Sequence, residues 1–280
     1  MRHAFAIAQC VAVGLALAFL VLPLVAIFGR VPPGDLAAAL GSDIVLDALM
    51  VSVRTSLVAI AIILVVGTPT AYLLATRRFP GRTLVVTLLE LPLVLPPAVA
   101  GIGLFAAFGR SGLVGGELDA LGIRIPFTQL AVVLAVLFVA SPFYLRQALA
   151  AFESVDRDLV DAARTLGASP YRVFRRIALP LASGGLAAGT TLAFARGVGE
   201  FGATIIFAGN FEGVTQTLPL AIYSQLNRDL DTALAIGGLL VAFSAGVLLA
   251  VKLLPSWTRT ASAWTYRSPS DTSRSEPHSA

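Results

Sequence analysis

Two charged residues inside an otherwise apolar segment are the first candidates for chemistry in this 280-residue chain. Arg196 and Glu200 are four residues apart, so a helix would place both side chains on one face. A charged side chain in such a segment must face protein or water. The two residues could form a structural ion pair, or Arg196 could contact an anion.

The sequence lacks the residues that hydrolytic and metal-dependent enzymes usually use. Both histidines, His3 and His278, lie near the ends of the sequence, and there is no H-E-x-x-H motif. An intramembrane enzyme would need a nucleophile–base pair or a metal cluster. The only lysine, Lys252, is not in a P-loop, whose lysine holds phosphates. We therefore expect no catalytic residue, no metal site and no cofactor bound by this chain.

A second group of charges lies between Asp158 and Pro180, where aspartates and arginines surround Gly167. Apolar residues at helical spacing predict a short helix that ends at this glycine. Ser169 and Pro170 are typical of an N-cap and a first turn, and they begin a second helix that Pro180 should end. A basic hairpin of this kind could lie on anionic headgroups, but its acids and its apolar ridge favour a docked protein partner.

The composition places these groups in a membrane protein, because 57% of the residues are hydrophobic and only 13% are charged. About 20 apolar residues cross the hydrocarbon core as a helix. The excess of arginine is typical of membrane topology and does not indicate nucleic-acid binding. We predict an all-α membrane protein with six transmembrane helices, at about 5–28, 51–75, 84–108, 126–148, 184–207 and 232–254.

The distribution of positive charge predicts the orientation. With both termini inside, fourteen of the twenty lysines and arginines fall on the cytoplasmic side and four on the other. The hairpin then belongs to a cytoplasmic loop, 150–182, of a transmembrane domain that covers residues 1–255. The polar, serine-rich residues 256–280 are predicted to be a disordered cytoplasmic tail.

The hairpin resembles the signature loop of permease subunits in bacterial and archaeal ABC importers. That motif reads E-A-A, three residues, G, nine residues, I-x-L-P. Asp161-Ala162-Ala163, Gly167 and Ile177-Ala178-Leu179-Pro180 occur here at the same spacing. The departure is Asp161, which keeps the charge of glutamate but is shorter by one methylene.

This resemblance implies a MetI-like, type I permease in the cytoplasmic membrane, acting as a homodimer within membrane lipid. Two ATPase subunits, which carry the ATP and Mg²⁺, would dock on the loops, and a periplasmic or lipid-anchored oxyanion-binding protein would deliver the substrate. An ion-driven secondary transporter is the alternative that needs no ATPase. The residues expected to couple to the ATPase are Asp161, Ala162, Ala163, Gly167, Tyr171, Phe174, Arg175, Ile177, Leu179 and Pro180.

Three further stretches resemble the branch of this family that carries tetrahedral oxyanions. They are the double proline Pro96-Pro97, the GEFGAT run at 199–204 and the TQTLPLAIY run at 215–223. The resemblance covers residues 45–254 and favours molybdate, because a compact single permease is similar to the homodimeric type. Tungstate has nearly the same size and charge. A permease for sulfate, thiosulfate or another small anion is the alternative.

A dianion in a low-dielectric passage needs hydrogen-bond donors or positive potential to offset its lost hydration. Proline and glycine interruptions free backbone groups, and threonines supply hydroxyls. Three prolines within six residues predict a hinge or gate at 92–101. The residues expected along the path or its gate are Pro92, Pro96, Pro97, Gly101, Thr190, Arg196, Glu200, Thr204, Thr215 and Thr217.

Overall fold

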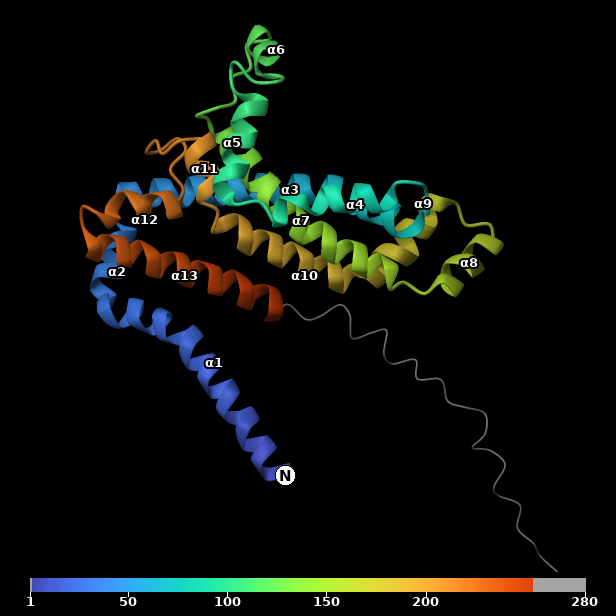
Figure 1. Ribbon diagram of the computed structural model, residues 1–280, viewed down its shortest axis with the longest axis horizontal. Coiled ribbons are helices and arrows are strands. Elements are labelled where there is room, and N and C mark those ends of the chain that lie inside the picture. Colours follow the sequence, from blue (N-terminus) through green and yellow to red (C-terminus); the bar gives the residue numbers. More distant parts are fainter. Residues whose placement is uncertain (1, 254–280) are drawn as a thin grey trace, which may run out of the picture.

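The hydrocarbon core of a membrane contains no water that could hydrogen-bond to the backbone. An apolar segment that crosses it must therefore pair its own amide and carbonyl groups, as an α-helix does. The computed structural model describes residues 2–253, and within them the chain forms helices and turns but no strand (Figure 1). The predicted all-α fold is confirmed. The helices are α1 (Arg2–Arg30), α2 (Pro33–Leu40), α3 (Asp43–Thr76), α4 (Arg82–Glu90), η1 (Leu91–Leu93), α5 (Pro97–Phe108), α6 (Gly115–Ala120), α7 (Gln129–Glu153), α8 (Arg157–Thr165), α9 (Pro170–Val173), η2 (Phe174–Ala178), α10 (Leu179–Val198), α11 (Gly202–Phe207), α12 (Leu218–Leu226) and α13 (Leu230–Leu253).

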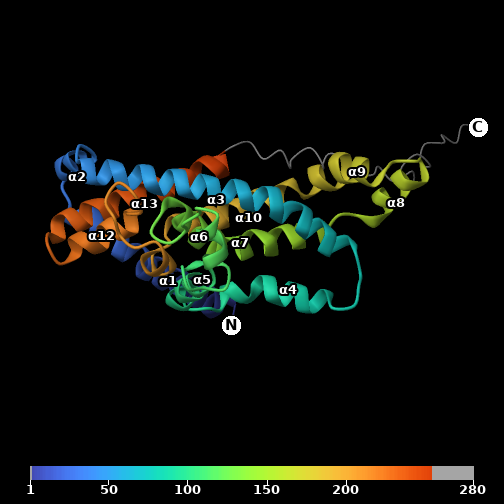
Figure 2. The ribbon, with the colours of Figure 1, turned by 90° about the horizontal axis from the view of Figure 1, so that it is seen from above.

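The centre of the bundle is α7, which packs against α3 on one side and α10 on the other. All three helices run along the long axis of the molecule (Figures 1 and 2). The face of α7 that meets its neighbours is rich in alanine, and Ala131, Ala135, Ala140 and Ala148 are fully buried. Small residues let helix backbones approach closely where the surrounding lipid supplies no hydrophobic drive.

Five helices are long and apolar enough to cross a membrane, and a bent pair brings the number to six among the described residues. The predicted first, second, fourth and sixth spans fall on α1, α3, α7 and α13. The helix α3 is longer than the predicted 51–75, because it begins at Asp43. The helix α1 leans away from the bundle (Figure 1), and none of its most apolar window is buried. The predicted tail, 256–280, lies outside the described residues.

The third predicted span, 84–108, is a bent pair and not a single helix. The chain bends by 112° between the segments Arg82–Leu93 and Pro97–Phe108. Pro92 lies in the 3₁₀ turn η1, and Pro97 is the first residue of α5. Proline lacks an amide hydrogen and suits the first turn of a helix but not its interior, so the prolines end one helix and start the next. The predicted break is confirmed.

The fifth predicted span, 184–207, is wrong at both ends, and Pro180 does not end a helix as we predicted. One helix of 29 residues runs from Pro170 to Val198. In an α-helix the ring of Pro180 would clash with the carbonyl four residues earlier. The residues just before it form a π-helical turn, η2. In this wider turn the hydrogen bond between residues four apart, which proline cannot make, is not required. The hairpin is therefore continuous with a membrane span.

At its other end this helix stops at Val198, and after three intervening residues α11 begins at Gly202. The chain then leads through 208–217 to α12, which packs on α13 and α3. Leu218, Leu220 and Ala221 of α12 are buried. The segment between α11 and α13 therefore folds back onto the bundle.

Close packing of α7 against α10 generates the first prediction. A Cβ added at Gly185 of α10 would lie 2.4 Å from the Cβ of Ala151 of α7. That atom is fixed to the backbone, so the two helices would have to separate. Gly185→Ala should therefore destabilise the protein by about 1–3 kcal/mol, the usual cost of overpacking.

The measurement is chemical unfolding of the full chain in mixed micelles. The matched control is Gly237→Ala in α13, where an added Cβ meets nothing within 4 Å; it should match or slightly exceed the stability of the unchanged protein. Equal stability of the two variants would show that α7 and α10 do not pack as described.

Candidate functional site

The hairpin between Asp158 and Pro180 is shaped by two local hydrogen-bonding motifs. At the end of α8, the amide of Gly167 donates to the carbonyl of Arg164 (2.9 Å), and the amide of Ala168 donates to that of Ala163 (3.0 Å). This is a Schellman motif, which needs a left-handed residue, and Gly167 has a φ of +79°. The predicted helix end at Gly167 is confirmed.

The start of the next helix also agrees with the prediction made from the sequence. The hydroxyl of Ser169 accepts from the amide of Arg172 (3.4 Å), and Pro170 is the first residue of α9. On α8, Asp156 is the N-cap and accepts from the amide of Asp158 (2.9 Å). Caps satisfy amides that have no partner within the helix, so both ends of the turn are set locally.

The hairpin exposes an apolar ridge as well as its charges. No residue of α8 is buried, and Leu166 and Tyr171 are 88% and 67% exposed. Asp161 is exposed and forms a 3.2 Å ion pair with Arg164 of the same helix. Large exposed apolar side chains beside charges are typical of a protein-binding surface. The other predicted coupling residues that face outward are Ala162, Arg175 and Pro180.

Part of the predicted coupling set instead faces the bundle. The ring of Phe174 lies 4.7 Å from that of Tyr72 in α3 and 6.3 Å from that of Phe152 in α7. The half-buried Phe174 and Leu179 both pack against the main core. These residues anchor the hairpin to the bundle, while α8 stands clear of it (Figure 1).

An ion pair that sequence reasoning did not foresee lies next to this anchor. Arg82 donates from Nη2 to Oε1 of Glu153 (2.5 Å) and from Nε to the carbonyl of Leu74 (2.7 Å). It thereby joins the start of α4 to the ends of α7 and α3. Arg82 and Glu153 are 71 residues apart in the chain, and no local pattern indicates such a pairing.

The two interrupted regions of the chain meet each other. A Cβ at Gly101 of α5 would lie 2.9 Å from the carbonyl oxygen of Ala203, and one at Gly202 would lie 2.6 Å from the Cβ of Pro97. The helices α5 and α11 are therefore in near-backbone contact. Pro97 and Gly101 from the predicted gate thus lie against the GEFGAT run.

Arg196 and Glu200 form an ion pair at the break between α10 and α11, with Nη2 and Oε2 2.7 Å apart. The other carboxylate oxygen, Oε1, accepts from the amide of Ala203 at 2.7 Å. Glu200 thus precedes the start of α11 and Arg196 lies in the last turn of α10, so each charge faces the favourable end of a helix dipole. The Glu200 side chain is 1% exposed and that of Arg196 27%.

The predicted threonines are spread over several elements. Thr190 donates to the carbonyl of Leu186 (2.8 Å) within α10. Thr215 lies before α12, and its hydroxyl accepts from the amide of Phe211 (3.0 Å). The hydroxyls of Thr204 and Thr217 are buried and have no hydrogen-bond partner within residues 2–253.

Residues 63–260 match the family model described as "Binding-protein-dependent transport system inner membrane component". The chain belongs to this family. It is 45% identical over 235 residues to the molybdenum transport system permease protein ModB of Mycobacterium bovis, covering 83% of this chain and 88% of the relative. It is 34% identical over 219 residues to a probable sulfate transport system permease of Nephroselmis olivacea, covering 78% of this chain and 77% of that protein.

Solved structures of ABC importers share the permease fold. A chain of a bacterial alginate ABC transporter gives a TM-score of 0.70 at 16% identity, over 89% of this permease and 92% of that chain. A chain of the MetNI methionine ABC transporter gives 0.60 at 20% identity, over 79% and 95%. At these identities the likeness establishes the fold, and the predicted MetI-like permease fold is confirmed.

The buried ion pair generates the second prediction. Arg196→Met would leave the carboxylate of Glu200 buried without its cation, so we expect a loss on the order of 3 kcal/mol in the free energy of unfolding. The double variant Arg196→Met/Glu200→Gln should recover most of this loss, because the glutamine oxygen can still accept from the amide of Ala203.

Chemical unfolding of the full permease in mixed micelles compares the three proteins. A double variant as unstable as Arg196→Met would contradict a structural role for the pair, since removing both charges would then have repaired nothing.

Proposed function

We propose that this chain is the membrane-spanning subunit of an ATP-driven importer for molybdate. The observation that carries the proposal is the 45% identity to a molybdenum transport permease over most of both chains. The hairpin at 150–182 supports it, because its cap, its glycine and its exposed ridge suit a docking element. Both termini would be cytoplasmic, as the charge distribution indicates.

The rival substrate is sulfate or thiosulfate, since a probable sulfate permease is also a relative, although a more distant one at 34% identity. Molybdate and sulfate are both tetrahedral dianions. Tungstate nearly matches molybdate in size and charge, so we expect the two to share the path.

Energy would enter through the hairpin from a separate ATPase that carries the ATP and Mg²⁺. Two copies of the permease would form a homodimer with the passage at their interface. Closure of two ATPase subunits on ATP would bring the loops together and favour the outward-open state, and hydrolysis would reset it. The nucleotide can shift this equilibrium only by its different affinity for the two states. A binding protein would present the anion outside.

The path would run past the interrupted helices. Proline residues at 96 and 97 are exposed in the single chain, as a face toward a second copy would require. The hydroxyls of Thr204 and Thr217 are buried without a hydrogen-bond partner within residues 2–253, so an opening of the break would free them to donate hydrogen bonds to an oxyanion. Arg196 is tied to Glu200 and would act mainly by holding the break in shape, although its partial exposure leaves it some contact with the anion.

The coupling role generates a third prediction. Gly167→Val places a β-branched residue at a φ of +79°, which should cost about 1–2 kcal/mol locally and distort the turn between α8 and α9. We expect ATP hydrolysis by the assembled transporter to continue while molybdate uptake falls sharply. The variant should still insert into the membrane.

Gly167→Asn is the matched control, because asparagine tolerates the left-handed conformation, and it should retain uptake. Both variants are compared in proteoliposomes by ATPase rate and accumulated molybdate. Normal coupling in Gly167→Val would contradict the assignment of the hairpin.

The substrate assignment generates a fourth prediction. Proteoliposomes that contain the permease, its ATPase and its binding protein should accumulate molybdate only when ATP is supplied, and a tenfold excess of sulfate should compete weakly. If the binding protein bound sulfate tightly and did not bind molybdate, the assignment of molybdate as the substrate would be wrong. Uptake by the permease alone under an ion gradient would instead indicate a secondary transporter.

A further inference from the structure

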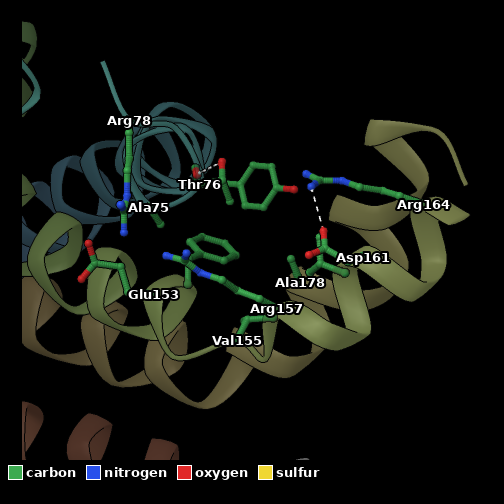
Figure 3. Close-up of a pocket in the computed structure, with 12 residues that line it drawn as sticks. Ala75, Thr76, Arg78, Glu153, Val155, Arg157, Asp161, Arg164 and Ala178 are labelled. Carbon is green, nitrogen blue, oxygen red and sulfur yellow. Dashed lines mark hydrogen bonds and ion pairs between the residues drawn. The ribbon is translucent and has the colours of Figure 1, made fainter. Parts of the chain in front are cut away.

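A cavity of about 380 Å³ lies between the hairpin and the bundle (Figure 3). Its walls come from the ends of α3 and α7 and from one face of α8. We call it the arginine cavity. The polar residues that line it include Arg78, Glu153, Arg157, Asp161 and Arg164.

The charges in this cavity are not balanced. Glu153 is bound by Arg82, and Asp161 is bound by Arg164. Within residues 2–253, Arg78 and Arg157 are not part of any ion pair. The cavity therefore holds two cations that have no carboxylate partner among the described residues.

The two free arginines enter the cavity from different elements. Arg78 follows the end of α3, and Arg157 is the first residue of α8. Figure 3 shows both side chains extending into the space beside Glu153. Two like charges that converge in a partly enclosed space repel each other unless an anion lies between them. Their orientation favours a ligand inside the cavity over an outside partner surface.

We propose that the arginine cavity binds a phosphate-type anionic group, held by the guanidinium groups of Arg78 and Arg157. Guanidinium matches the tetrahedral oxygens of such a group in geometry and forms strong charge-assisted hydrogen bonds with them. The group comes either from the headgroup of an anionic phospholipid or from a free oxyanion in the cytoplasm. The volume accommodates both.

The bound anion would brace the hairpin, a consequence that rests on the proposed coupling function. No residue of α8 is buried, and its main contacts are with α9 and η2. Arg78 belongs to the bundle side of the cavity and Arg157 to α8. An anion held by both would therefore join α8 to the bundle at a point where residues 2–253 form no ion pair.

Binding to the purified full-length permease, without the ATPase, tests the site separately from transport. In one arm, native mass spectrometry counts phosphatidylglycerol retained by the permease from nanodiscs of mixed phosphatidylglycerol and phosphatidylcholine. In the other arm, inorganic phosphate and molybdate are titrated in nanodiscs of phosphatidylcholine alone. Arg78→Gln/Arg157→Gln should weaken binding about tenfold in the arm that supplies the ligand.

The matched control is Arg172→Gln, which removes an exposed arginine of the same hairpin that does not line the cavity. It should bind like the unchanged protein. Ligand binding should also slow hydrogen exchange in α8, and it should do so in the control but not in the double variant. This second readout detects the bracing directly.

Three outcomes would overturn the proposal. The unchanged protein could bind no anion in either arm, or the double variant could bind as well as the control. Alternatively, added ligand could slow hydrogen exchange in α8 as much in the double variant as in the control. None of these results bears on whether molybdate is the transported ion.

Discussion

The need to satisfy every backbone group without water is the constraint on which this structure depends. A helix that crosses the membrane can be interrupted only where other groups replace its lost hydrogen bonds. At the break after α10, the carboxylate of Glu200 accepts from the amide of Ala203, and Arg196 compensates its charge. At the other break, prolines remove amide hydrogens that would have lacked a partner. The interruptions are tolerated because nearby groups compensate for the lost backbone hydrogen bonds at each one.

The same requirement for hydrogen-bond partners also explains why the break before α5 and the break before α11 lie together. Non-helical backbone at membrane depth is tolerated when it is buried in protein or lines a cavity. Gly101 and Gly202 allow α5 and α11 to approach almost to backbone contact, so each break is covered by the other segment. A change in one break must therefore be accommodated by the other, as the proposed gate would require.

Features set by neighbours in the sequence could be predicted, and those set by distant contacts could not. The turn at Gly167 and the cap at Ser169 depend on bonds within five residues, and both follow from residue type. The inward position of Phe174 depends on Tyr72 and Phe152, which come from other helices. Helix continuity through Pro180 depends on a π-helical turn, whereas proline by itself favours a helix end.

That continuity bears on how a movement of the hairpin would reach the proposed passage. The helix from Pro170 to Val198 has 29 residues, and at 1.5 Å per residue it is about 43 Å long. It begins directly after the Schellman turn and ends beside Glu200. Had Pro180 ended a helix, a flexible joint would have separated the proposed docking surface from the break. The π-helical turn instead keeps the two ends on one continuous helix, so a displacement of the hairpin would be expected to shift the Arg196–Glu200 pair and the α5–α11 contact that follows it.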